Sequence, residues 1–227
     1  MIALCREHAD QADSGAFRDE QLRTLKAGGA RRDAVRGRFN WMRQEVLVRA
    51  GGNFYYRTPV IFELGAMPCV WLSWDDENNL LLNFRMPTLS GRPRASIEEN
   101  FWTLPADVDE MICPPSGRLV EVMYRNGDRF RAEFLQVSNA AGLAARYPRG
   151  GVSSWASKLE FPLTLAEVWE TAAGTTLEFG PNSSRIGGIV MQENFASDCG
   201  VGIHVGIPDE QLRRLFPSDL TPRDRST

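Results

Sequence analysis

The chain contains few of the residues that build metal and redox sites: two histidines and four cysteines in 227 residues. The cysteines, Cys5, Cys69, Cys113 and Cys199, are far apart and form no C-x-x-C pair. Because a zinc site made only of cysteine needs closely spaced ligands, such a site is not expected. We expect Cys69, Cys113 and Cys199 to be buried free thiols.

Long apolar runs and an excess of charge of one sign are also missing. No stretch approaches the roughly 18 consecutive apolar residues of a membrane span, and Met1 to Asp10 lacks the basic and apolar regions of a signal peptide. The 26 Lys and Arg residues nearly balance the 29 Asp and Glu residues. We therefore expect a cytoplasmic protein without a membrane partner, in which any contact with nucleic acid comes from a local patch.

Motifs of several enzyme classes are absent as well. The sequence has no G-x-S-x-G turn for a serine nucleophile, and its paired glycines fit neither nucleotide-binding spacing. His204 lies in an alternating segment, Val201 to Ile207, that is typical of a strand, so it is predicted to be structural. Solvated surface positions are predicted for the acidic residues Glu98, Glu99, Asp107, Asp109 and Glu110.

After Asn40 the chain has the composition of a β protein. Val, Phe, Tyr, Trp and Leu are dense there, and Gly, Asn, Asp and Pro interrupt them at short intervals. The run Asp75 to Asn79 is predicted to be a hairpin loop, because it lacks the spacing of a calcium loop. Strands are predicted at Val46 to Val48, Phe54 to Tyr56, Val60 to Leu64, Val70 to Trp74 and Leu80 to Phe84.

The aromatic side chains of this region allow two interpretations. With Arg43, Arg49 and Arg57 among them, they could form a platform on which nucleic-acid bases stack. They could instead form the core, which we favour because Trp and Tyr are common in β cores. The residues concerned are Trp41, Phe54, Tyr55, Tyr56, Trp71, Trp74 and Trp102.

A further hairpin is predicted from Leu119 to Val137, with Asn126-Gly127 as a two-residue type I′ turn. In this register Met123 faces Phe130 and Val122 faces Arg131. The core face would then hold Leu119, Met123, Phe130, Ala132 and Phe134, and the opposite face would hold Val122, Tyr124, Arg129 and Arg131.

Residues 138–158 are predicted to form a short helix followed by an exposed loop, and they mark the best candidate boundary within the β region. Asp209 to Phe216 is predicted to be one amphipathic turn before a mobile polar tail. Between these segments, a sandwich or a short solenoid would accommodate the small strands predicted at Leu163 to Trp169, Thr175 to Phe179, Gly188 to Met191 and Val201 to Val205.

The first 38 residues have a different character. Phe17 to Lys26 is predicted to be a short helix with Leu22 and Leu25 on one face, ended by Gly28-Gly29. From Arg31 to Arg49 arginine outnumbers the acidic residues. Such a segment is typical of a solvated linker into a strand, and it would also suit an arm that contacts phosphate groups.

Cys5 and His8 are the only metal-ligand pair of close spacing in this segment. They lie three residues apart, near enough to share one metal ion where the backbone turns. Two ligands do not complete a metal site, and packing is the more common role of such a pair.

The sequence from Ile2 to Lys26 resembles the C-terminal half of the HNH endonuclease motif. One branch of that family has a strand N-x-I-x-L-C, a helix x-x-H-H-x-x-A-D-x-G-A-[FY] and a second helix ending in Q-L-R-x-L-K. The β-rich region after Trp41 is also similar to the uncharacterised region that follows this motif in some bacterial proteins. The matching residues of the motif are Ile2, Leu4, Cys5, His8, Ala12, Asp13, Gly15, Ala16, Phe17, Gln21, Leu22, Arg23, Leu25 and Lys26.

The resemblance implies a ββα-metal nuclease, in which histidines hold a divalent cation (Mg, Ni or Zn) and another histidine activates water against a DNA phosphodiester. The first His and the Asn of the family motif would precede Met1, and Ala9 replaces the second His of the pair, which binds the metal in the family. Cys5 and His8 therefore remain as the metal-site residues, and no catalytic residue is assigned.

We therefore expect an α+β protein, with a short helical remnant of an HNH module followed by a predominantly antiparallel β region of one or two domains. The leading function is HNH-type, metal-dependent DNA hydrolysis, impaired by the incomplete motif, with Arg31, Arg32, Arg36 and Arg38 facing DNA. The alternative is a non-catalytic β-rich module that recognises a protein or ligand partner. The expected divisions are an HNH-like module with its basic linker (1–38), a β-rich domain (39–147), a second β-rich subdomain (148–206) and a mobile tail (207–227).

Overall fold

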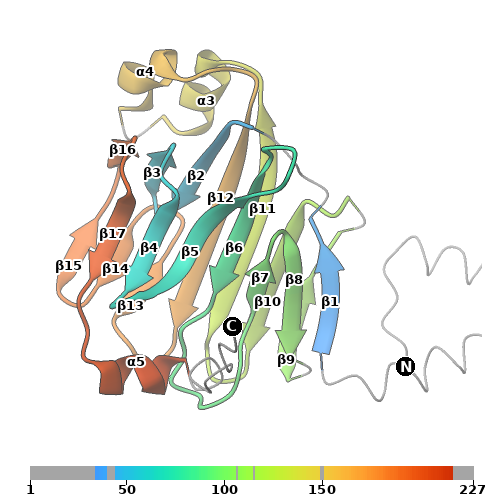
Figure 1. The fold of residues 1–227 in the computed structure, drawn as a ribbon, viewed down its shortest axis with the longest axis vertical. Helices are drawn as coiled ribbons and strands as arrows, with labels where there is room; N and C mark the ends of the chain where they lie inside the picture. Colours follow the sequence, from blue (N-terminus) through green and yellow to red (C-terminus); the bar gives the residue numbers. More distant parts are fainter. Residues whose placement is uncertain (1–33, 40–43, 106, 115, 149–150, 217–227) are drawn as a thin grey trace, which may run out of the picture.

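The computed structural model describes residues 34–39, 44–105, 107–114, 116–148 and 151–216. Within them the chain forms two mixed β-sheets that pack face to face, with short helices at both ends (Figure 1). This architecture confirms the β-rich α+β class expected from the sequence. The predicted helix at Phe17 to Lys26, the pair Cys5 and His8, and the tail after Phe216 lie outside the described residues.

Sheet A has seven strands, and β1 and β17 form its edges. Neighbouring strands are antiparallel except β4 and β17, which run parallel. The order across the sheet is β1 (Ala34–Arg38), β8 (Phe101–Pro105), β7 (Ser96–Glu98), β6 (Leu80–Arg85), β5 (Met67–Trp74), β4 (Val60–Leu64) and β17 (Val201–Val205).

Sheet B has ten strands. Its main path is entirely antiparallel. The order along that path is β15 (Ile189–Met191), β14 (Ser184–Ile186), β13 (Leu177–Phe179), β12 (Leu163–Ala172), β11 (Arg129–Val137), β10 (Leu119–Tyr124) and β9 (Val108–Ile112).

The long strand β12 shares one of its edges between two partners. Residues 164–168 pair in parallel with β2 (Val46–Ala50), and residues 170–172 pair with β13. From β2 the sheet continues to β3 (Asn53–Tyr56) and then to β16 (Phe195–Ser197), which lies parallel to β3. Strands from residues 46–56 and from residues 163–197 therefore contribute to the same sheet.

Short helices occupy the connection between β11 and β12: α3 (Ala140–Arg146), α4 (Val152–Trp155) and the 3₁₀ turn η1 (Ala156–Lys158). The side chain of Asn139 caps α3 by accepting a hydrogen bond from the Gly142 N–H. The prediction of an exposed loop at the end of this segment is wrong, because Val152 and Trp155 are buried against sheet B. β11 and β12 pair along the whole length of β11. Residues 138–158 therefore connect two neighbouring strands of one sheet.

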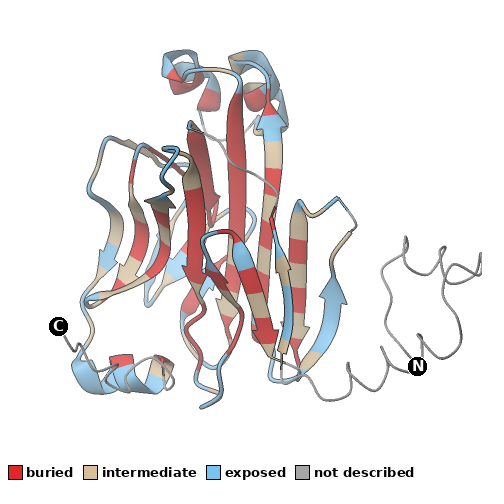
Figure 2. Ribbon diagram, turned by 45° about the vertical axis from the view of Figure 1, so that its right-hand side comes forward, coloured by how far each residue is buried: buried red, intermediate tan, exposed pale blue. Residues whose placement is uncertain are grey.

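Two hydrophobic clusters hold these layers together. The larger one fills the space between the two sheets, where Phe84 stacks on Phe130 with ring centroids 4.2 Å apart. The smaller one lies between the outer face of sheet B and α3, α4 and η1, and includes Leu47 and Leu165. Figure 2 shows the buried residues concentrated in the central strands. Because β2 and the first half of β12 are covered on both faces, they are buried throughout.

The hairpin of β10 and β11 forms as predicted, but its register is shifted by one residue. Val122 faces Phe130 and Met123 faces Arg129, because Tyr124 and Asp128 close a three-residue loop in which Gly127 has φ +89°. The predicted core face is therefore wrong for the first strand. The residues that face the core are Val120, Val122, Tyr124, Phe130, Ala132 and Phe134.

The other strand predictions agree with the structure: β2 to β6 include the five segments predicted between Val46 and Phe84. The turn after β5 also agrees, since Asp75 Oδ1 accepts hydrogen bonds from the N–H groups of Glu77 and Asn79. α5 (Asp209–Leu215) is the predicted last helix. Across the described residues, no helix combines the length and the apolar character that a membrane span requires.

Candidate functional site

The sequence-predicted DNA arm is only partly within the described residues. Arg31 and Arg32 lie outside them, as do Cys5 and His8. Arg36 and Arg38 lie two positions apart on the edge strand β1, so both project from the same face of sheet A and both are exposed. The Arg38 guanidinium lies over the ring of Phe101, 4.7 Å from its centroid.

The aromatic residues around β3, β5 and β8 belong mainly to the core, as we favoured. Phe54, Tyr55, Tyr56 and Trp102 are buried, whereas Trp71 is half-buried and Trp74 is exposed. Arg49 is buried too, with 7% of its surface accessible. Most of these side chains therefore have no face available for a base to stack on.

Histidine and cysteine do not assemble into a metal site in the described part of the chain, where no group of three or more His, Cys, Asp or Glu side chains could hold an ion. His204 Nδ1 lies 2.8 Å from Glu63 Oε1 on the exposed face of sheet A. Cys69 is a buried free thiol, as predicted, and Cys113 and Cys199 are half-buried.

A candidate site lies in a groove on the outer face of sheet B, with a volume of about 380 Å³. We call it the sheet-B groove. It crosses β9, β10, β11, β12 and β13. Because α3, α4 and η1 cover only one end of this face, the rest of it stays open. Its charged and aromatic outer-face side chains are Glu110, Glu121, Arg129, Arg131, Trp169 and Glu178.

Strand register places the groove residues in rows. One row runs from Ile112 through Glu121 and Arg131 to Trp169. The next row holds Glu110, Met123, Arg129, Thr171 and Glu178. Residues that face each other across neighbouring strands project to the same side of a sheet, so each row is continuous on the outer face.

Arg131 forms the centre of the groove floor. Its Nη1 donates to Glu121 Oε2 and its Nη2 donates to Glu133 Oε2, both at 2.6 Å. Its guanidinium also lies over the Trp169 ring, 4.7 Å from the centroid. Two charge-assisted hydrogen bonds and a cation–π contact fix this side chain, of which only 20% is exposed.

A buried network closes the groove at the end next to the helices. Glu167 is 3% exposed and accepts hydrogen bonds from Arg49 Nη1 and the Tyr147 hydroxyl, each at 2.8 Å, and from Arg146 Nη2 at 3.2 Å. Burial and the neighbouring Glu167 carboxylate raise the pKa of Tyr147, so its hydroxyl stays protonated and donates. Arg49 also donates to the Pro181 carbonyl, which ties β2 to the wall of the groove.

Two buried donors at the groove have no hydrogen-bond partner among the described residues: Trp169 Nε1–H and Arg131 Nε–H. Buried N–H groups are almost always paired with protein, water or ligand atoms. Both N–H groups lie beneath the accessible surface of the groove, in the layer of side chains that forms its floor.

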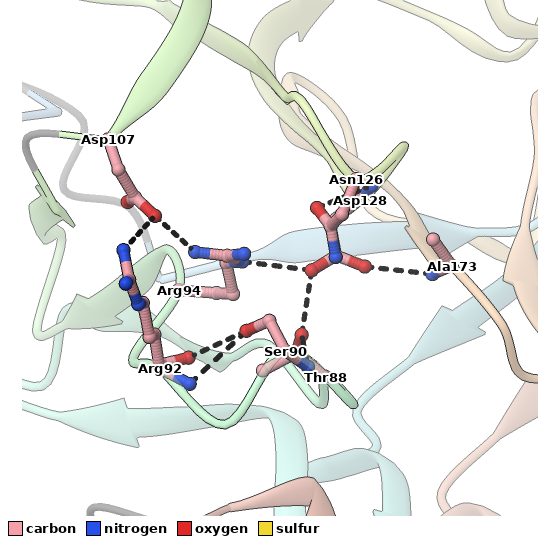
Figure 3. Close-up of polar contacts among 8 residues, drawn as sticks. All are labelled: Thr88, Ser90, Arg92, Arg94, Asp107, Asn126, Asp128 and Ala173. Atoms are coloured by element: carbon pink, nitrogen blue, oxygen red, sulfur yellow. Dashed lines mark hydrogen bonds and ion pairs between the residues drawn. The ribbon is translucent and has the colours of Figure 1, made fainter.

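A second polar cluster lies at the opposite end of the sandwich, around Asp128 (Figure 3). Asp128 is fully buried, and its carboxylate accepts hydrogen bonds from Thr88 Oγ1 at 2.7 Å, Arg94 Nε at 2.9 Å and the Ala173 N–H at 2.8 Å. Burial opposes ionisation, but these bonds outweigh it and lower the pKa of Asp128. The cluster fastens the β10–β11 hairpin to the loop before β7, so we assign it a structural role.

Asp107 belongs to this cluster and is exposed, which agrees with its prediction as a surface group. It accepts a hydrogen bond from Arg94 Nη1 at 2.9 Å, and Arg94 is itself only 9% exposed. The pairing joins residues 13 positions apart across two connections, which local sequence patterns do not reveal.

Glu170 lies behind the groove, on the core side of β12. It is 1% exposed, and neither of its carboxyl oxygens has a hydrogen-bond partner among the described residues. Burial, assisted by the charge of Asp128, raises the pKa of Glu170 to about 8. The side chain is therefore mainly a neutral carboxylic acid at pH 7.

The groove is not among the sites predicted from the sequence. The predicted hairpin register places Glu121 on the core-facing side of its strand and Arg131 on the opposite face, so it does not bring the two side chains together. The alternation from Arg129 to Phe134, in which every second residue is charged, is the signal that identifies the outer face.

No family model, curated protein or solved structure matches the chain.

Proposed function

We propose that this protein is a ligand-binding β-sandwich module and that the sheet-B groove is its binding site. The observation that carries the proposal is a hollow of about 380 Å³ in which Glu110, Arg129 and Glu178, none of them in an ion pair among the described residues, surround the fixed Arg131. Sites for small molecules are typically hollows of roughly 300–1,000 Å³ with a few fixed polar groups.

Acceptor capacity in the groove supports the same proposal. Glu121 and Glu133 each use one oxygen, Oε2, for Arg131, and Oε1 has no partner among the described residues. Glu110, Arg129 and Glu178 likewise form no ion pair within the described part of the chain. A ligand can therefore bind without breaking the contacts that hold the floor.

The site is also rigid before any ligand arrives. Its polar groups project from paired strands and not from loops, and Arg131 is held by three contacts. Side chains fixed in this way lose little conformational freedom when a ligand binds, which favours affinity.

A retention experiment tests the proposal. Full-length protein is incubated with a small-molecule extract of bacterial cells, desalted and examined by native mass spectrometry. We expect a bound mass that denaturation releases, and we expect the Met123→Trp variant to lack it, because the larger side chain fills the groove. Ile189→Trp, the same type of change on the exposed strand β15, serves as the control and should retain the ligand. Absence of a bound mass, or equal retention by Met123→Trp, would contradict the proposal.

A second candidate function is HNH-type DNA hydrolysis, implied by the resemblance of Ile2 to Lys26. The observation that favours it is the position of Arg36 and Arg38, which project together from β1 beside the exposed Phe101 and directly follow the motif in the chain. Guanidinium groups beside an aromatic ring suit contact with a nucleic-acid backbone and its bases. Cys5 and His8 would supply two ligands to a divalent ion, whose role in such enzymes is to polarise the phosphodiester and activate water.

Plasmid cleavage by the full chain with Mg²⁺, Ni²⁺ or Zn²⁺ tests this candidate. Metal-dependent cleavage that His8→Ala abolishes would support it. Cleavage that persists in His8→Ala, or no cleavage with any of the three ions, would reject the assignment of Cys5 and His8 to a nuclease site.

A further inference from the structure

We infer that the ligand of the sheet-B groove is a neutral saccharide, an inference that rests on the groove being the binding site proposed above. Three features of the groove carry it: the sign of its charge, the mixture of donors and acceptors on its floor, and the apolar side chains at its β9 wall.

The charge of the groove disfavours anionic ligands. Its outer-face lining includes three carboxylates against two guanidinium groups, and Arg131 is already neutralised by Glu121 and by Glu133, which lies beside the groove. A phosphate or carboxylate ligand would meet a net negative surface, and like charges oppose association. The lining carboxylates are Glu110, Glu121 and Glu178.

The polar groups on the floor require a partner that both donates and accepts. The carboxylates of Glu110, Glu121 and Glu178 can only accept hydrogen bonds, whereas the guanidinium of Arg129 can only donate. In the second row the donor Arg129 lies between the acceptors Glu110 and Glu178, on strands whose neighbours are about 4.8 Å apart. A cation could satisfy only the acceptors, whereas adjacent hydroxyl groups can satisfy both kinds.

One wall of the groove is apolar. Ile112 on β9 is 56% exposed and projects from the outer face beside Glu121, and Met123 on β10 is half-buried. A pyranose ring presents hydroxyl groups at its edge and C–H groups on its faces. Such a ring can direct its hydroxyls to the Glu and Arg side chains while its C–H face contacts β9, which a fully polar ligand cannot do.

Isothermal titration calorimetry of the full chain tests the inference, with maltotriose, cellotriose, xylotriose and triacetylchitotriose as probes. We expect at least one of them to bind, and Met123→Trp to weaken that binding by about tenfold or more. Glu133→Gln keeps the shape of the side chain but removes the charged acceptor, and should weaken binding in the same direction. Ile189→Trp should leave the affinity unchanged.

The outcomes separate the two claims. Failure of all four trisaccharides to bind, or equal binding by Met123→Trp, would overturn the saccharide inference. Arginine amide and AMP are titrated in parallel as cationic and anionic probes. If one of these binds to the wild type but not to Met123→Trp, the groove remains a ligand site and only the saccharide assignment is wrong. If the retention experiment also finds no ligand that depends on Met123, the proposed function itself fails.

Discussion

At the scale of single residues, the sandwich contains two buried carboxyl groups that are held in opposite protonation states. Asp128 is ionised because Thr88, Arg94 and a backbone N–H bond its carboxylate. Glu170 faces the same core without a hydrogen-bond partner among the described residues, and the charge of Asp128 adds to the effect of its burial. Partner groups, and not depth of burial alone, decide which of the two is charged.

Glu170 should make stability fall as pH rises. Its pKa is about 8 in the folded chain against 4.5 for an ordinary glutamate, so between these values the folded state binds more protons than the unfolded state. The free energy of unfolding should therefore decrease by about 1.4 kcal/mol per pH unit between about pH 5 and about pH 8. Asp128 titrates below this window and the buried Cys69 thiol above it.

Urea unfolding of wild type and Glu170→Gln across this range measures the effect. Because glutamine does not titrate, we expect the variant to gain stability relative to the wild type as pH rises. Parallel pH profiles for the two proteins would show that Glu170 is already ionised in the folded chain.

Asp128→Asn should destabilise the fold strongly. The substitution removes the charge that faces the buried Arg94, and breaking a buried ion pair on one side destabilises a protein by about 3 kcal/mol or more. Asp109→Asn provides the control, because its pair with Arg125 is solvent-exposed and should leave the free energy of unfolding nearly unchanged. Chemical denaturation compares the two; equal effects would mean that Asp128 does not hold the hairpin in place.

At the scale of elements, the positions of the strands follow from the sequence, but their register and pairing do not. Alternating and apolar runs mark β2 to β6 because burial of one or both faces acts on each strand locally. Asn126-Gly127 is compatible with both two-residue and three-residue loops, and a shift of one residue exchanges the faces of β10. The groove could not be predicted because it depends on that register.

The pairing of strands that are distant in the sequence could not be predicted either. β2 and β12 pair in parallel although Arg49 and Glu167, which join across them, are 118 residues apart. The two strands are covered by the main core on one side and by α3 and α4 on the other. Nothing in either local pattern identifies its partner. The basic segment around Arg36 and Arg38 could be recognised from composition, but not its position on an edge strand.

Gly127→Ala tests the observed loop. With φ at +89°, an alanine there adopts a backbone conformation that L residues rarely occupy, and we expect a loss of about 1–3 kcal/mol in the free energy of unfolding. Gly188→Ala, at a position with open space and no positive φ, is the matched control and should change stability by less than about 0.5 kcal/mol. A similar small change in both variants would argue against the three-residue loop.

At the scale of the whole molecule, the sandwich has two outer faces of different character. The outer face of sheet B is partly covered by helices and carries the groove, whereas sheet A presents Arg36, Arg38 and Phe101 near its β1 edge. The core between the sheets fixes both faces, so ligand binding on one requires no rearrangement of the other. We propose that ligands bind to the face that carries the groove.

The indole N–H of Trp169 gives the most direct measurement of that claim. The chain has six tryptophans, so a ¹H–¹⁵N spectrum resolves a small set of indole signals, and the Trp169→Phe variant identifies the one of interest. With the bacterial small-molecule extract added, we predict a shift of the Trp169 signal, while that of the exposed Trp74 on sheet A stays in place. A shift of Trp74 with Trp169 unchanged, or no shift of either, would contradict the account.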